Sequence, residues 1–273
     1  MSLIVKFYSA VITRETRKLL KQKDKLASAM VRPFLWLWII GGGMQALAGQ
    51  DYIARLVPGI VGMSLLFGGM VGGLSIAFDK DSGTMRLLVT SPVSHVHVLL
   101  AKAISAGIAA LVQTGLLLTA LALFEGAYWL LQTFSFNLQL VLPWTGHLNW
   151  PNMLLLLPVL CLSAISCGLL GVAVGVSAKT IDSFAVMMNF VIFPLFFLSG
   201  ALYPIAPMPA LARWAASINP FTYCVDLLRH VFNSHAEFAV VYSMGYLLAS
   251  ALLMLAFSLW RFSQNGAALP LSQ

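Results

Sequence analysis

FDKDSGTMRLLVTSPVS, residues 78–94, is the charged segment that separates two long apolar runs of the chain. Four charged side chains lie within eight of its residues. Gly83 offers a break in the preceding helix, residues 84–90 have the pattern of a short amphipathic helix, and Ser91-Pro92 ends it. A short helix held between two membrane spans suits a docking element that moves both spans together. A plain solvated loop is the alternative that composition leaves open.

The composition of the chain indicates an integral membrane protein. Of its 273 residues, 60% are hydrophobic and 9% are charged, and the mean hydropathy is +0.89. Soluble domains carry about 25% charged residues, so this chain has too little polar surface to cover itself in water. A helix needs about 20 apolar residues to cross the hydrocarbon core. The length therefore predicts roughly six spans and little else.

The apolar runs predict an all-α protein with six transmembrane helices. An amphipathic, basic interfacial helix precedes them within residues 1–30, and it is suited to lying beside anionic lipid. A solvated basic arm is the alternative for this helix. The six-span bundle fills residues 31–260, and a tail follows at 261–273. The expected spans are residues 31–48, 56–77, 95–124, 153–178, 183–198 and 239–260.

Two further stretches shape the expected bundle. Between spans five and six, residues 199–237 are too apolar for a free loop and too broken by proline for one helix, which predicts a broken, re-entrant segment. In the second span, Gly68, Gly69, Gly72 and Gly73 form two small-xxx-small pairs that let helices approach closely. Their neighbour is either another helix of this chain or a second copy of it.

The distribution of Lys and Arg predicts the orientation in the membrane. With both termini inside, thirteen of these residues fall on the cytoplasmic side and three fall outside: Arg55, Arg213 and Arg229. Residues 125–152 contain neither Lys nor Arg and carry three tryptophans, which indicates an outer surface. The net charge of +7 is thus explained by orientation and does not require a nucleic-acid partner.

The chain shows no sign of its own catalytic chemistry. The stretch nearest to a phosphate-binding loop, residues 171–180, has Ala178 in place of the glycine before Lys179 and lies at the end of a span, so it is rejected. The cysteines and histidines lack metal-ligand spacing. We therefore expect no catalytic residue, no metal and no cofactor in this chain.

A few polar residues lie within the expected spans or the outer segment. Gln113 and Asn189 either face a substrate path or bond to a neighbouring helix. Asp226 and Arg229 are three residues apart, and we expect them to pair with each other.

The chain as a whole resembles permease subunits of the ABC-2 type transporter family. The resemblance rests on the amphipathic N-terminal helix, six spans, FDKDSGTMRLLVTSPVS after the second span and LSGALYPI…INPFTY after the fifth. It implies two permease subunits and two separate ATPase subunits, which bind ATP and Mg. It further implies export of amphipathic or lipid-linked molecules across the bacterial inner membrane.

The resemblance also implies roles for individual residues. ATPase docking falls on Asp79, Lys80, Gly83, Thr84, Arg86, Ser91 and Pro92. The outer gate falls on Gly200, Tyr203, Pro204, Asn219 and Pro220. The chain departs from the family where Asp79-Lys80-Asp81 stands in place of a glutamate-rich run. The leading hypothesis is the membrane subunit of an ATP-driven exporter, working as a homodimer. The alternative is a membrane anchor that assembles a complex without transporting anything.

Overall fold

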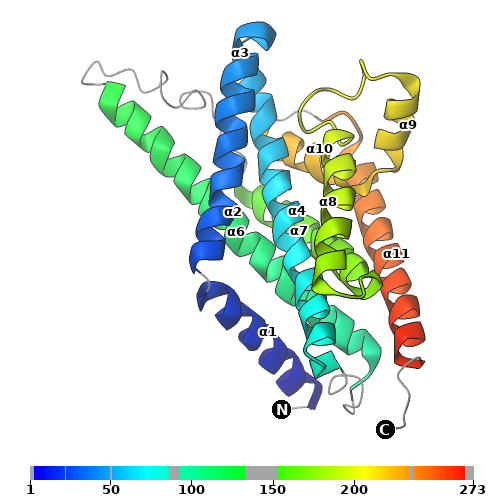
Figure 1. Ribbon diagram of the computed structural model, residues 1–273. Coiled ribbons are helices and arrows are strands. Elements are labelled where there is room, and N and C mark those ends of the chain that lie inside the picture. Colours follow the sequence, from blue (N-terminus) through cyan, green and yellow to red (C-terminus); the bar gives the residue numbers. More distant parts are fainter. Residues whose placement is uncertain are drawn as a thin grey trace.

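The computed structural model describes residues 3–21, 23–49, 51–85, 93–132, 153–233 and 236–267. Within these ranges the regular structure is helical, without a strand (Figure 1). The all-α class is therefore confirmed.

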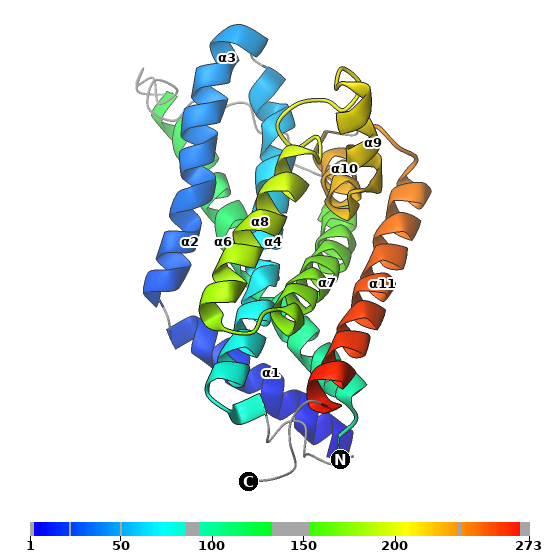
Figure 2. The same ribbon diagram turned by 45° about the vertical axis from the view of Figure 1, so that its right-hand side comes forward.

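The N-terminal half begins with a helix that lies across one end of the bundle. This helix, α1 (Leu3–Lys21), crosses the lower ends of the long helices in Figures 1 and 2. The chain then rises through α2 (Lys23–Trp36), a π-helical turn η1 (Leu37–Gly41) and α3 (Gly42–Ala48). Gly49 has φ +87°, a left-handed conformation that glycine adopts without strain, and it lets the chain reverse. The long helix α4 (Asp51–Asp81) returns to the α1 end.

The second half adds three long helices, one of intermediate length and two short ones. They are α6 (His95–Gln132), α7 (Met153–Ser177), α8 (Ile181–Phe197), α9 (Ala210–Ile218), α10 (Pro220–Asn233) and α11 (Val240–Ala267). A capping box starts α8: the Thr180 hydroxyl accepts from the Ser183 N–H, and the Ser183 hydroxyl lies 2.9 Å from the Thr180 nitrogen. The short helices α9 and α10 lie at the end of the bundle opposite α1, here called the α9 end (Figure 2).

Helix α4 is the centre of the molecule. In its most apolar stretch 83% of the residues are buried, against 22% in that of α11. It packs against α6, α7, α8 and α10, so a displacement of α4 reaches most of the bundle.

Glycines bring α4 into close contact with its neighbours. A Cβ added to Gly73 would overlap the backbone of Gly171, and one added to Gly69 would lie 2.5 Å from the Cys167 backbone. On the other side, a Cβ on Gly68 would lie 2.5 Å from the Ala110 Cα. The small-xxx-small pairs thus serve contacts within the chain, between α4 and the helices α6 and α7.

Among the residues that the structure describes, four helices are long and apolar enough to span a membrane: residues 52–81, 95–130, 154–177 and 240–264. The apolar helices 29–44 and 181–197 are shorter, so the six-span count stays a prediction. The π-helical turn η1 interrupts the apolar helix 29–44. Residues 199–237 do contain two separate short helices, as the prolines suggest, while their depth in the membrane stays a prediction.

Candidate functional site

Lys102 is the centre of a buried ion cluster that joins three helices. Its ammonium group donates to Glu15 Oε1 at 2.9 Å, to Ser75 Oγ at 2.6 Å and to Asp79 Oδ2 at 2.5 Å. The side chains of Lys102 and Asp79 are 3% and 4% exposed. Because an ammonium has three N–H donors, every donor of Lys102 has an acceptor. The cluster therefore ties α1 to α4 and α6.

Two more contacts complete this ion cluster, which comprises Arg14, Glu15, Ser75, Asp79 and Lys102. Arg14 Nη2 lies 3.4 Å from Asp79 Oδ1, and the Ser75 hydroxyl donates to Glu15 Oε1 at 2.9 Å. Two cations face two carboxylates, so the formal charges cancel. Burial alone would raise the pKa of Glu15, but the Lys102 charge and the hydrogen bonds from Lys102 and Ser75 outweigh it, so the pKa is lowered.

Lys80 caps a helix of the same chain. Its ammonium group donates to the carbonyl oxygens of Gly175, Val176 and Ala178, at 3.1, 2.6 and 2.7 Å. The last carbonyls of a helix lack partners within it, and a cation there complements the helix dipole. Lys80 thus fastens the end of α4 to the end of α7.

The docking residues inferred from the sequence fall into three groups. Asp79 and Lys80 are engaged within the chain, as described above. Gly83 is exposed and has φ +71°, which confirms the expected break after α4, and the hydroxyls of Ser82 and Thr84 lie 2.9 Å apart. The remaining three docking residues, Arg86, Ser91 and Pro92, lie outside the described residues.

At the α9 end, Asn219 joins α8 to the junction of α9 and α10. Its side-chain amide donates to the Leu195 carbonyl at 2.7 Å and its oxygen accepts from the Phe221 N–H at 2.9 Å. Pro220 begins α10 and is half-buried, while Tyr203 and Pro204 are exposed. Of the expected gate residues, Asn219 and Pro220 are therefore adjacent, and Tyr203 and Pro204 face outward.

The expected pairing of Asp226 with Arg229 is wrong. Arg229 forms its ion pair with Glu237 at 2.6 Å and donates to the Gly200 carbonyl at 2.5 Å. Asp226 accepts from the Glu237 N–H and from the Ser243 hydroxyl, at 2.7 and 2.8 Å. The turn before α11 folds back over α10, and this brings Glu237 between the two side chains. Gly200, with φ +78°, is thereby tied to α10.

The two amides considered for a substrate path lie apart in the fold. Gln113 is buried on α6, whereas Asn189 is on an exposed face of α8, where it donates to the Ala185 carbonyl one turn earlier. Helix α8 packs against α4, α7 and α10. The structure therefore does not bring Gln113 and Asn189 into one site.

Sequence reasoning missed Glu15. It lies in a helix dominated by basic residues, and its partners are 60 and 87 residues away. The one indication in the sequence was that an acidic residue occurs in this otherwise basic amphipathic helix. Helix α1 also contacts the bundle through an aromatic side chain, because Tyr8 bonds His97 Nδ1 at 3.0 Å.

Comparison of the sequence with known proteins identifies the family of this chain. The sequence model described as ABC-2 type transporter matches residues 7–233. The inner membrane transport permease YadH of Escherichia coli (strain K12) is 27% identical over 234 residues, which cover 85% of this chain and 82% of that protein. Nodulation protein J of Rhizobium leguminosarum bv. trifolii is 26% identical, covering 83% and 82%. The putative transport permease ycf38 of Pyropia yezoensis is 24% identical, covering 85% and 75%. Since the family model covers most of the chain, from α1 to α10, this protein belongs to the ABC-2 type transporter family.

Proposed function

We propose that this chain is the membrane-spanning permease subunit of an ABC exporter in the bacterial inner membrane. A separate ATPase subunit binds ATP and Mg and supplies the energy. The transported molecule is amphipathic or lipid-like and leaves the cytoplasm. Family membership and the permease named in Escherichia coli support a transport role, and the scarcity of charged side chains supports an apolar cargo.

Residues 79–94 are here called the docking loop. The observation that carries the proposal is that α1, α4, α6 and α7 are connected to one another where this loop begins. The ion cluster connects α1 and α6 to α4, and Lys80 connects α7 to α4. A force applied by an ATPase to this loop would thus reach four helices at once. Gly83 and Thr84 form the described part of the docking surface, and Arg86, Ser91 and Pro92 complete it.

The permease acts as a pair of identical chains in this proposal. In the described part of the chain the centre of the bundle is filled by α4, which supports a passage formed with a second copy. The glycines of α4 and α7 are used within the chain, so a partner would contact exposed apolar side chains, which lie on α2, α6, α7, α8 and α11. Residues 199–220, with Gly200, Tyr203, Pro204, Asn219 and Pro220, form the outer gate, and Gln113 and Asn189 are the two amides proposed for a substrate path.

Arg86→Glu tests the proposal. A guanidinium is suited to pairing with carboxylates, so Arg86 is expected to bind an acidic groove on the ATPase. Loss of a partly buried interface charge costs about 2–5 kcal/mol. The permease is co-expressed with a candidate ABC ATPase from the same genome and purified through a tag on the permease. We expect Arg86→Glu to lose the ATPase while the permease still inserts and pairs.

Arg55→Glu is the matched control, because Arg55 is an exposed arginine at the opposite end of α4. It should retain the ATPase. ATP-dependent transport is then followed in inverted vesicles with a fluorescent lipid analogue, and native mass spectrometry counts the permease copies. An Arg86→Glu variant that binds ATPase and transports like the parent would contradict a docking role. A complex that binds ATPase without moving any cargo would favour the membrane-anchor alternative.

A further inference from the structure

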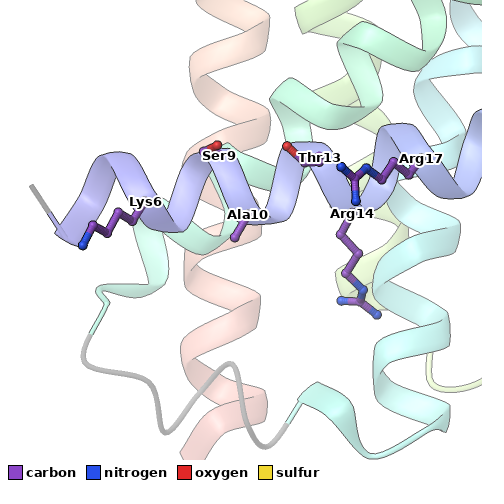
Figure 3. Close-up of a pocket in the computed structure, with 6 residues that line it drawn as sticks. All are labelled: Lys6, Ser9, Ala10, Thr13, Arg14 and Arg17. Atoms are coloured by element: carbon purple, nitrogen blue, oxygen red, sulfur yellow. The ribbon is translucent and has the colours of Figure 1, made fainter. Parts of the chain in front are cut away.

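The outward face of α1 forms a basic groove. It has a volume of about 420 Å³ and is lined by six residues of α1 (Figure 3). These residues are Lys6, Ser9, Ala10, Thr13, Arg14 and Arg17. In Figure 3 Lys6, Ala10 and Arg14 follow one edge, while Ser9 and Thr13 follow the other. Their spacing of three and four residues places all six on one helix face.

The opposite face of α1 holds this groove in its orientation. Tyr8 bonds His97, Glu15 bonds Lys102 and Ser75, and the Lys18 ammonium lies 4.8 Å from the centre of the Phe78 ring. These contacts lie at the ends of the candidate spans 52–81 and 95–130. Helix α1 is therefore fixed beside the ends of two candidate spans, with its basic face exposed and Arg14 alone of the lining reaching back to the bundle.

The chemistry of the groove fits a phosphate better than a protein surface. Its lining contains three cations, two hydroxyls and no carboxylate. Among the described side chains of α1, Val5 is the one large apolar side chain that is exposed. Stable protein interfaces have a charge-poor centre anchored by aromatic or other large side chains, and this face offers neither. Basic segments at the cytoplasmic membrane surface are instead attracted to anionic lipids.

We propose that this groove is a binding site for the phosphate headgroup of an anionic membrane phospholipid. Lys6 and Arg17 supply charge, and the hydroxyls of Ser9 and Thr13 donate to phosphate oxygens. Arg14 has a half-exposed side chain and lies 3.4 Å from Asp79, so it is shared between the headgroup and the ion cluster. A bound lipid thereby contacts the same cluster that joins α1 to α4 and α6.

The test uses the full-length permease, purified with its ATPase through a tag on the permease and placed in nanodiscs of phosphatidylcholine with a small fraction of phosphatidylglycerol. Native mass spectrometry measures the phosphatidylglycerol retained on each chain. A basic residue near an anionic surface strengthens binding about fivefold, so the Lys6→Gln, Arg17→Gln double variant should bind about twenty-five-fold more weakly. The Lys21→Gln, Lys179→Gln double variant removes the same charge outside the groove and should change binding less than fivefold. Lys6→Arg should bind like the parent.

The competing explanations give different results in the same experiment. Equal weakening in both double variants would show general surface attraction and overturn the site. Displacement of the bound lipid by millimolar inorganic phosphate would identify a site for free phosphate and overturn the lipid assignment. If the groove variant keeps its lipid but loses the co-purified ATPase, the groove faces a protein partner and the proposal is wrong. Size-exclusion profiles matching the parent establish that each variant is folded.

Discussion

At the scale of single residues, we expect Lys102 to contribute most to the attachment of α1 to α4 and α6. Replacing it by Met would leave Glu15 and Asp79 buried without their shared cation. Breaking a buried ion pair from one side costs about 3–5 kcal/mol, because the remaining charge is uncompensated. We expect Lys102→Met to lower the free energy of unfolding by about that amount, measured by denaturation in mixed micelles.

Two controls separate the charge effect from a general effect of the substitution. Lys179→Met changes an exposed lysine and should leave the free energy of unfolding within about 0.5 kcal/mol of the parent. The triple variant Glu15→Gln, Asp79→Asn, Lys102→Met leaves only the half-exposed Arg14 charged and contains no buried unpaired charge, so it should be more stable than Lys102→Met alone. A Lys102→Met protein as stable as the parent would show that the ion cluster contributes nothing to the attachment of α1.

At the scale of helices, the contact between α4 and α7 depends on the absence of side chains. A Cβ on Gly171 would overlap the Gly69 carbonyl and lie 2.9 Å from the Met70 Cα. Overpacking of this kind costs about 1–3 kcal/mol. We expect Gly171→Ala to lower the free energy of unfolding in mixed micelles by that amount, although alanine is the better helix former.

Gly245→Ala is the matched control on α11, because a Cβ at Gly245 meets nothing within 4 Å. It should stabilise the protein by about 0.5–1 kcal/mol through helix propensity alone. Equal effects at the two glycines would contradict the close contact between α4 and α7.

The same elements show what the sequence could predict. Hydrophobic runs and small-xxx-small spacing are local patterns, so the helices and the glycine contacts were predictable. Glu15, Lys80 and Glu237 were not predictable, because each finds its partners through folding of distant segments. The i, i+3 spacing favoured Asp226 with Arg229, yet a turn that follows α10 supplied a closer partner. Tertiary proximity decided the ion pairs, and spacing along one helix did not.

At the scale of the whole molecule, the basic residues expected outside are separated from the basic groove on α1. The three assigned to the outside from sequence, Arg55, Arg213 and Arg229, lie on the first turns of α4, on α9 and on α10, toward the α9 end (Figures 1 and 2). The groove on α1 and the turn at Lys179 lie at the other end. This separation supports placing the α1 end in the cytoplasm, since basic residues accumulate there.

Cysteine labelling in intact cells tests this orientation. Cys161, Cys167 and Cys224 are free thiols, so they are first replaced by alanine. A cysteine at position 140, in the stretch without basic residues, should then react with a membrane-impermeant maleimide. Lys179→Cys, at the opposite end, should react only after the cells are permeabilised, because the inner membrane shields it. Protection at position 140 together with labelling at position 179 would require the whole bundle to be inverted, and the groove on α1 would then face away from the anionic cytoplasmic leaflet that it is proposed to bind.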